Sequence, residues 1–118
     1  MEPWRLEYTT KCFNCGEIVP QIIEIYPNQA FVECSNCKAK RYYIIRRVGI
    51  EDESIILKEK NKEHKYDLWE LEYKTICFNC KKESIQKIIF TESKLIIRCE
   101  ECGFTRVYNF HILEIPEE

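Results

Sequence analysis

The sequence predicts a mainly β protein built from two tandem units, each a small antiparallel sheet, joined by a charged connector. Three observations carry this prediction. The second half of the chain repeats the first, each copy contains two Cys-x2-Cys pairs at one spacing, and the flanking segments alternate apolar and polar residues. A repeat of this length indicates a duplicated structural unit, and alternation with a period of two is typical of half-buried strands.

The duplication is visible when the chain is compared with itself at an offset of 65 residues. Trp4–Cys15 then falls on Trp69–Cys80, and sixteen of the 47 residues from 4 to 50 are identical in the second copy without a gap. The two tryptophans precede the cysteine pairs at matching positions, and we expect them to be core or packing anchors, with base stacking as the alternative. The predicted division of the chain is a first unit at 1–50, a charged connector at 51–68 and a second unit at 69–118.

The eight cysteines form the strongest motif of the sequence. In each unit eighteen residues separate two Cys-x2-Cys pairs, which gives two sets: Cys12, Cys15, Cys34 and Cys37, then Cys77, Cys80, Cys99 and Cys102. Four thiolates at about 2.3 Å from one ion, arranged as a tetrahedron, hold structural zinc. The spacing matches zinc patterns, so we expect two Zn²⁺ per chain. The alternatives are buried free cysteines, disulfides, or iron held by the same four sulfurs.

The predicted elements follow the same order in both units. Leu6, Tyr8 and Thr10 alternate with polar residues and predict a strand before the first cysteine pair. Further β-branched and aromatic runs predict strands at 22–26, 30–33, 41–46, 85–90, 95–98 and 105–110. In the connector, Glu51–Lys65 is compatible with a short helix or with a further strand, and its charge run from Lys58 indicates a solvated surface.

With these motifs, the chain resembles the zinc ribbons. The resemblance covers about 100 of the 118 residues and rests on Cys12-Phe-Asn-Cys15-Gly16, Cys34-Ser-Asn-Cys37, Cys77-Phe-Asn-Cys80 and Cys99-Glu-Glu-Cys102-Gly103. It implies two zinc knuckles per unit and a binding module, since zinc ribbons occur in transcription factors, RNA polymerase subunits, ribosomal proteins and RNA-modifying machinery. The glycine that commonly follows a knuckle is present as Gly16 and Gly103 and is replaced by Lys38 and Lys81.

Composition argues against a disordered, membrane-spanning or secreted protein. The 118 residues are 45% hydrophobic and 13% aromatic, which argues against disorder. No apolar run has the roughly 20 residues of a membrane-spanning helix, and Met1–Thr10 lacks the charged and apolar regions of a secretory signal. We therefore expect a cytoplasmic protein without a membrane partner. The abundance of Glu, Lys and Ile resembles the bias of hyperthermophile proteomes.

The sequence contains no pattern that indicates an enzyme. All eight cysteines are used by the repeat, and a closed four-sulfur site has no open position for water or substrate. His64 lies in the charge run and His111 stands where the first unit has Arg46, so neither histidine is duplicated. We expect no catalytic residue and no small-molecule substrate.

Local charge indicates where a partner binds. The formal net charge of −2 becomes about −6 when eight thiolates and two Zn²⁺ are added, which argues against promiscuous nucleic-acid binding. Cations and tyrosines nevertheless gather in the first unit at Lys38, Lys40, Arg41, Tyr42, Tyr43, Arg46 and Arg47. Such side chains suit phosphates and bases, so we expect this unit to bind nucleic acid, with RNA favoured, or a ribonucleoprotein or transcription assembly. The alternatives are a charged strand face with inward tyrosines, a protein–protein adaptor with purely structural zinc, and a rubredoxin-like iron electron carrier.

Overall fold

The computed structural model describes residues 3–116, so the outermost residues of the two predicted units, 1–2 and 117–118, lie outside the described part. Eight strands and one helix are found in this range. In chain order they are β1 (Trp4–Lys11), β2 (Ile18–Ile25), β3 (Gln29–Cys34), β4 (Lys40–Ile50), α1 (Ser54–Asn61), β5 (Trp69–Ile76), β6 (Glu83–Phe90), β7 (Lys94–Cys99) and β8 (Phe104–Glu114). The strands include the segments that the sequence predicted as strands, except that β2 ends one residue before Tyr26. Pro20 lies inside β2, where it is opposite Thr9 of β1.

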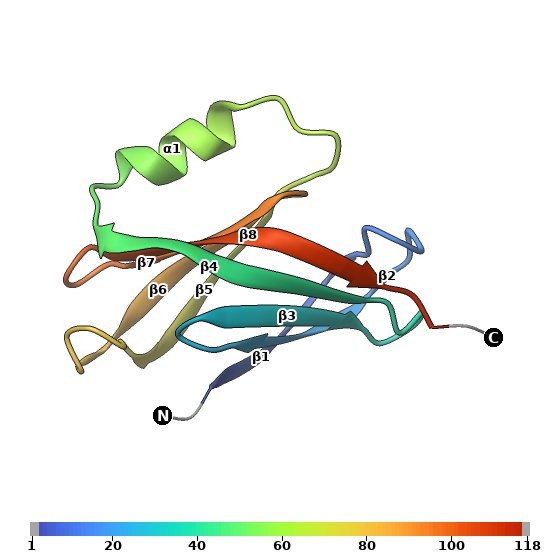
Figure 1. Cartoon of the computed structure of the whole chain (residues 1–118), viewed down its shortest axis with the longest axis horizontal. Helices are drawn as coiled ribbons and strands as arrows, with labels where there is room; N and C mark the ends of the chain where they lie inside the picture. Colours follow the sequence, from blue (N-terminus) through green and yellow to red (C-terminus); the bar gives the residue numbers. More distant parts are fainter. Residues whose placement is uncertain (1–2, 117–118) are drawn as a thin grey trace.

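All eight strands belong to one antiparallel sheet in the order β1-β2-β3-β4-β8-β7-β6-β5 (Figure 1). The mainly β, antiparallel character is confirmed, but the prediction of two small separate sheets is wrong. The two units meet where β4 pairs with β8 along most of their length. A four-stranded meander leaves its last strand with unpaired backbone groups on one side, and pairing the two copies through these equivalent strands satisfies both.

From either edge of the sheet, the four strands of one unit follow in chain order toward the centre. The equivalent strands β4 and β8 therefore flank an approximate two-fold axis. The pairing of β4 with β8 has two register shifts, one with the extra residue His111 on β8 and one with the extra residue Arg46 on β4, and such bulges bend a strand and increase its twist. The sheet curls until the two edge strands, β1 and β5, are in contact, where the Tyr73 hydroxyl donates to the Arg5 carbonyl at 3.3 Å. The result is an almost closed sheet with an inner and an outer face.

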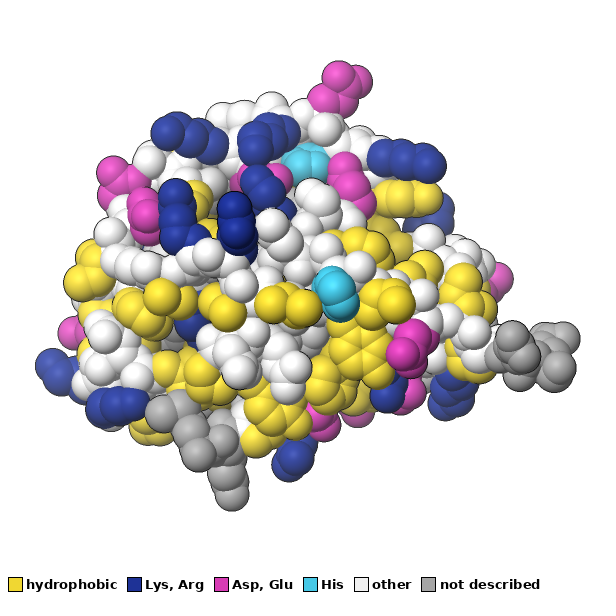
Figure 2. Space-filling view, viewed as in Figure 1, with side chains coloured by type: hydrophobic (Ala, Val, Ile, Leu, Met, Phe, Trp, Pro, Cys, Tyr) yellow, Lys and Arg dark blue, Asp and Glu magenta, His cyan; other side chains and the backbone are white. Residues whose placement is uncertain are grey.

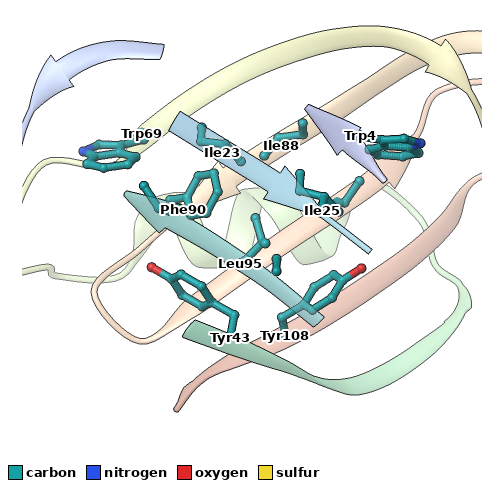
Figure 3. Packing of buried hydrophobic residues seen from close by; sticks show 12 residues of the cluster. Trp4, Ile23, Ile25, Tyr43, Trp69, Ile88, Phe90, Leu95 and Tyr108 are labelled. Carbon is teal, nitrogen blue, oxygen red and sulfur yellow. The ribbon is translucent and has the colours of Figure 1, made fainter. Parts of the chain in front are cut away.

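The main core fills the inner face and is built by both units (Figure 3). Trp4 and Trp69 are 5% and 2% exposed, which confirms that they are packing anchors. The ring of Tyr43, from the first unit, meets the ring of Phe90, from the second, edge to face at 5.7 Å. The main core is therefore shared by the two units.

The connector forms a helix rather than a strand, and α1 covers the outer face of the second unit (Figure 1). Ile56 is 2% exposed and joins Ile89, Ile96 and Val107, from β6, β7 and β8, in a second small core. One buried helical side chain on an aliphatic sheet surface suffices to orient the helix. No helix within residues 3–116 has the length and apolarity to cross a membrane.

Candidate metal centres and the adjoining surface

Four similar turns present the eight cysteines. The backbone N–H that follows the second cysteine of each pair donates to the carbonyl of the first, for example Gly103 to Cys99 at 2.9 Å and Lys38 to Cys34 at 3.0 Å. In all four turns this following residue has a positive φ, between 61° and 76°. Glycine adopts this conformation without steric cost, which explains Gly16 and Gly103, while Lys38 and Lys81 adopt it despite their side chains.

Each unit brings its own four sulfurs together. Within each group the four Sγ atoms lie within 4.8 Å of one another, with Cys12–Cys37 and Cys15–Cys34 separated by 3.9 Å and Cys77–Cys102 by 3.8 Å. Four sulfurs at about 2.3 Å from one ion at the corners of a tetrahedron would be about 3.8 Å apart. A disulfide would need about 2.05 Å. Both groups could therefore hold a metal ion, and the geometry excludes disulfides and a pairing of turns between units.

The thiols of each group differ in their readiness to ionise. Burial disfavours the thiolate and raises the pKa of Cys12 and of Cys77 to about 12. Burial also acts on Cys34, but the backbone N–H groups of Cys37 and Asn36 outweigh it and lower its pKa to about 6. Cys99, the matching thiol of the second group, likewise has a pKa of about 6. Each group thus contains a thiol that ionises more readily than an ordinary cysteine, and the thiolate is the form that binds metal.

Amide side chains surround the sulfurs of the first group more fully than those of the second. Asn14 and Asn36 donate across the group, to Cys37 at 3.5 Å and to Cys15 at 3.6 Å. In the second group Asn79 donates to Cys102 at 3.6 Å, but Glu101 stands where the first group has Asn36. Such N–H···S bonds offset thiolate charge and orient the ligands.

The sequence analysis missed a buried glutamine beside each group. Gln21 is 1% exposed and donates to Cys34 Sγ at 3.6 Å, and Gln86 occupies the matching position, 2% exposed. The duplication contained the signal, because glutamine is the one polar residue retained between the cysteine pairs of both copies.

In each unit, one buried arginine joins the first cysteine turn to the opposite unit. The Arg41 guanidinium lies 4.2 Å from the Phe13 ring, Phe13 stacks on Trp69 at 4.6 Å, and Arg41 donates to the Glu92 carbonyl of the β6–β7 turn at 3.0 Å. Thus Phe13 and Arg41, both from the first unit, are fixed by the second unit.

Arg106 repeats this arrangement in the other direction. Its guanidinium lies 4.2 Å from Phe78 and 4.8 Å from Trp4, and it donates to the Tyr26 carbonyl at 3.3 Å and to the Tyr108 hydroxyl. Burial lowers the pKa of Arg106 to about 10, while Tyr108 and the thiol of Cys77 act in the opposite direction. It is charged at neutral pH and offsets part of the negative charge of the nearby sulfurs.

The expected partner surface of the first unit needs a correction at two positions. Arg41 is 8% exposed and Tyr43 is fully buried, so both belong to the interior and neither can contact a partner. Their retention in the second copy, as Arg106 and Tyr108, was the sign of a structural role. Burial raises the pKa of Tyr43 to about 12. Its hydroxyl points toward the side of the core where Trp69 lies (Figure 3).

A comparison with known proteins places the chain in a family. The protein of Methanocaldococcus jannaschii described as "Uncharacterized protein MJ1158" is 67% identical over 117 residues, which are 99% of this chain and 91% of that protein. The chain belongs to the same family as MJ1158. No family model and no solved structure matches it.

In this member of the MJ1158 family, the remaining predicted contact residues occupy three different places. Lys38 is exposed on its cysteine turn. Lys40 and Tyr42 are half-buried on the outer face of the sheet, where Lys40 lies 3.8 Å from Glu33. Arg46 and Arg47 are exposed beside α1. The structure therefore does not gather the seven predicted residues into one patch.

Arg46 and Arg47 instead line a groove with residues that the sequence analysis assigned to a solvated connector. The groove has a volume of about 630 Å³ and lies between α1 and the outer face of β7, β8 and β4. We call it the basic groove after its cations, Arg46, Arg47, Lys58, Lys62 and Lys94. Figure 2 shows Lys and Arg side chains gathered around the helix. The docking of α1, which the sequence did not reveal, creates this concentration of charge.

Proposed function

We propose that the chain is a zinc-stabilised, non-enzymatic module that binds RNA through the basic groove. Zinc is the metal that we assign to both cysteine groups, because sulfur-only, four-coordinate sites are typical of structural zinc. The proposal contains no catalytic step, since all four positions around each ion would be occupied by protein sulfurs.

The single observation that carries the RNA assignment is the charge of the basic groove. Five cations line it, and its one acidic lining residue, Glu59, is 5% exposed. Lys62 and Lys94 share this carboxylate at 3.1 and 3.8 Å, and Arg47 lies 3.1 Å from Glu51. Among the described residues no carboxylate lies within ion-pairing distance of Arg46 or Lys58. These two cations are therefore free to bind phosphate.

The negative charge of the whole chain does not oppose this assignment. Local clusters of one sign concentrate counter-ions even on a protein of opposite net charge, and arginine matches the geometry of phosphate oxygens with paired donors. The connector's cations and the two arginines of β4 come from segments that only the folded chain brings together. A polyanion with closely spaced phosphates suits this groove better than a single small anion.

Charge reversal in the groove tests the proposal. We expect Arg46→Glu with Lys58→Glu to abolish binding of a labelled single-stranded RNA by the zinc-loaded protein, measured by fluorescence anisotropy. Wild-type affinity should fall steeply as salt rises toward physiological concentration. The charge-preserving pair Arg46→Lys with Lys58→Arg should bind nearly as wild type. Lys11→Glu with Lys74→Glu, at exposed lysines of β1 and β5, makes the same change in net charge and is the control.

A protein–protein adaptor is the second candidate, because exposed apolar side chains lie along β4 and β8. Ile44, Val48 and Ile112 are 45%, 53% and 46% exposed. If wild-type protein with both metals binds no RNA at low salt, or if the charge-reversed variant binds as wild type, the RNA proposal is wrong and the adaptor remains. Iron in place of zinc would give a coloured protein, because iron–thiolate centres absorb visible light.

A further inference from the structure

The two units have equivalent outer faces, but α1 covers only that of the second unit. At the offset of 65 residues, Phe31 matches Ile96 and Tyr42 matches Val107. Ile96 and Val107 are 2% and 8% exposed and lie beneath α1. Phe31 and Tyr42 are half-buried, and the one helix found in residues 3–116 covers the other unit. The first unit therefore leaves uncovered the face that the second unit closes.

The open face carries aromatic side chains where the covered face carries aliphatic ones. Phe31 and Tyr42 pair directly across β3 and β4, and their ring centroids are 5.9 Å apart. Tyr26 continues the line, with its ring 5.9 Å from Phe31 and nearly parallel to it, at 29°. Lys40 Nζ lies 5.7 Å from the Phe31 centroid. We call Tyr26, Phe31 and Tyr42 the aromatic row.

The aromatic row and the basic groove share one face of the sheet. The groove is lined by Val107, on the covered part of the outer face, and Tyr42 lies on the same side of β4, because its neighbours Arg41 and Tyr43 point inward. Tyr42 and Arg46 are four residues apart on β4, which corresponds to roughly 13 Å along an extended strand. A chain a few nucleotides long can reach both.

We propose that the aromatic row stacks on the bases of single-stranded RNA whose phosphates lie in the basic groove, and this rests on the RNA-binding function proposed above. Aliphatic side chains suffice beneath a helix, whereas half-buried rings beside cations provide the stacking surfaces that unpaired bases use. Bases in a duplex are stacked on each other and not available to the row. The row therefore makes the module selective for single strands.

The neighbours of the row favour this occupant over an apolar protein surface. Glu24 accepts from the Tyr26 hydroxyl at 3.3 Å and pairs with Arg5, and Lys40 pairs with Glu33. These charged groups border the rings, while Ile44 and Ile112, which pairs with Tyr42, continue the apolar area along β4 and β8. Hydrogen-bonding base edges tolerate the charged groups better than a packed helix would. The continuity with the basic groove adds the phosphate contacts that a single strand needs.

The test compares single-stranded and duplex RNA of the same sequence on zinc-loaded, full-length protein. We expect Phe31→Leu with Tyr42→Leu to weaken binding of the single strand about tenfold to hundredfold and to leave duplex binding unchanged. Tyr42→Phe keeps the ring and should bind as wild type. Zinc content and amide NMR spectra of each variant check that the fold is intact.

The outcomes separate this inference from the function on which it rests. If the leucine variant loses no single-strand affinity, or loses affinity for both RNAs equally, the stacking inference is wrong. The RNA-binding proposal stands in that case, provided that Arg46→Glu with Lys58→Glu abolishes binding. If the wild type binds neither RNA, both proposals are wrong.

Discussion

The ring of Trp4, at the start of the first unit, stacks on the ring of Phe78, in the first cysteine turn of the second unit, with centroids 4.6 Å apart and planes at 10°. The reciprocal pair, Trp69 and Phe13, has the same separation and planes at 8°. The first cysteine turn of each unit is thus held by the tryptophan of the opposite unit. Because the turn contributes two metal ligands, loss of metal from one unit removes a packing partner from the other.

The first prediction is that the two units unfold together. Trp4→Ala removes a ring that is 5% exposed, so we expect a loss of about 3–5 kcal/mol of unfolding free energy, measured by chemical denaturation of the metal-loaded protein. Amide signals of both units should disappear in one transition. Cys12→Ser should disorder the second unit as well as the first. A variant with native second-unit signals beside an unfolded first unit would show that the units are independent.

The second prediction concerns metal content. Elemental analysis of undamaged protein should give two Zn²⁺ per chain, because both groups have the sulfur geometry of a closed tetrahedral site. A strong chelator should unfold the chain, since the binding free energy of structural zinc contributes directly to folding. Cys99→Ser should lower the metal content and destabilise the whole sheet. Apo protein that keeps native amide dispersion in NMR would contradict this role of the metal.

The elements of this fold could be predicted from sequence, but their assembly could not. Alternation along segments such as Leu6–Thr10 reports which side chains are buried, and the cysteine spacing reports which four sulfurs meet. Neither reports that β4 pairs with β8, because a strand edge carries no sequence pattern that names its partner. The burial of Arg41 could not be predicted either. Adjacent basic and aromatic residues on one strand form the same sequence pattern whether the guanidinium faces solvent or packs on Phe13.

The duplication itself contained more information than the pattern of single residues. Some positions retained in both copies, such as Gln21 and Arg41, lie in the shared interior or beside the sulfurs. Some positions that differ, such as Phe31 and Arg46, lie on the outer face. The docking of α1 onto one unit alone breaks the symmetry, and this depends on Ile56 and the aliphatic surface beneath it. The sequence left that segment open between helix and strand.

The third prediction is that the second cysteine group releases its metal first. Asn14 and Asn36 donate to sulfurs of the first group at 3.5 and 3.6 Å, whereas the second has Asn79, the acidic Glu101 and a longer contact of 3.9 Å between the Ser84 hydroxyl and Cys80. Weaker compensation of thiolate charge makes those sulfurs more reactive toward electrophiles. During alkylation followed by mass spectrometry, Cys80 and Cys102 should be modified before Cys15 and Cys37.

Glu101→Asn provides the matched test, because it restores the residue that the first group has at this position. We expect it to slow metal release from the second group until both groups react at similar rates. Asn36→Glu, the reverse change, should accelerate release from the first group. Equal rates in the wild type would show that these amides do not control reactivity.

The fourth prediction concerns the pH dependence of stability through His64. Its Nε2 lies 2.7 Å from the Glu59 carbonyl and its Nδ1 lies 3.3 Å from Glu92 Oε2, so it joins the end of α1 to the β6–β7 turn. Only the protonated ring can donate at both nitrogens. The Glu59 carbonyl, with the Glu92 carboxylate and against the effect of burial, raises the pKa of His64 above its ordinary value.

Since the pKa is raised in the folded protein, this contribution is fully present below the ordinary histidine pKa of about 6.5 and is lost as pH rises through the folded value. We expect wild type to exceed His64→Gln in unfolding free energy by about 0.5–1 kcal/mol near pH 6, and the difference to vanish near pH 9. His111→Gln, at an exposed histidine of β8, should show no such trend. Metal content must be equal in all samples, because acid also protonates thiolates. A difference between wild type and His64→Gln that stays constant across this range would mean that the ring contributes by packing, and that its charge plays no part in fixing α1 to the sheet.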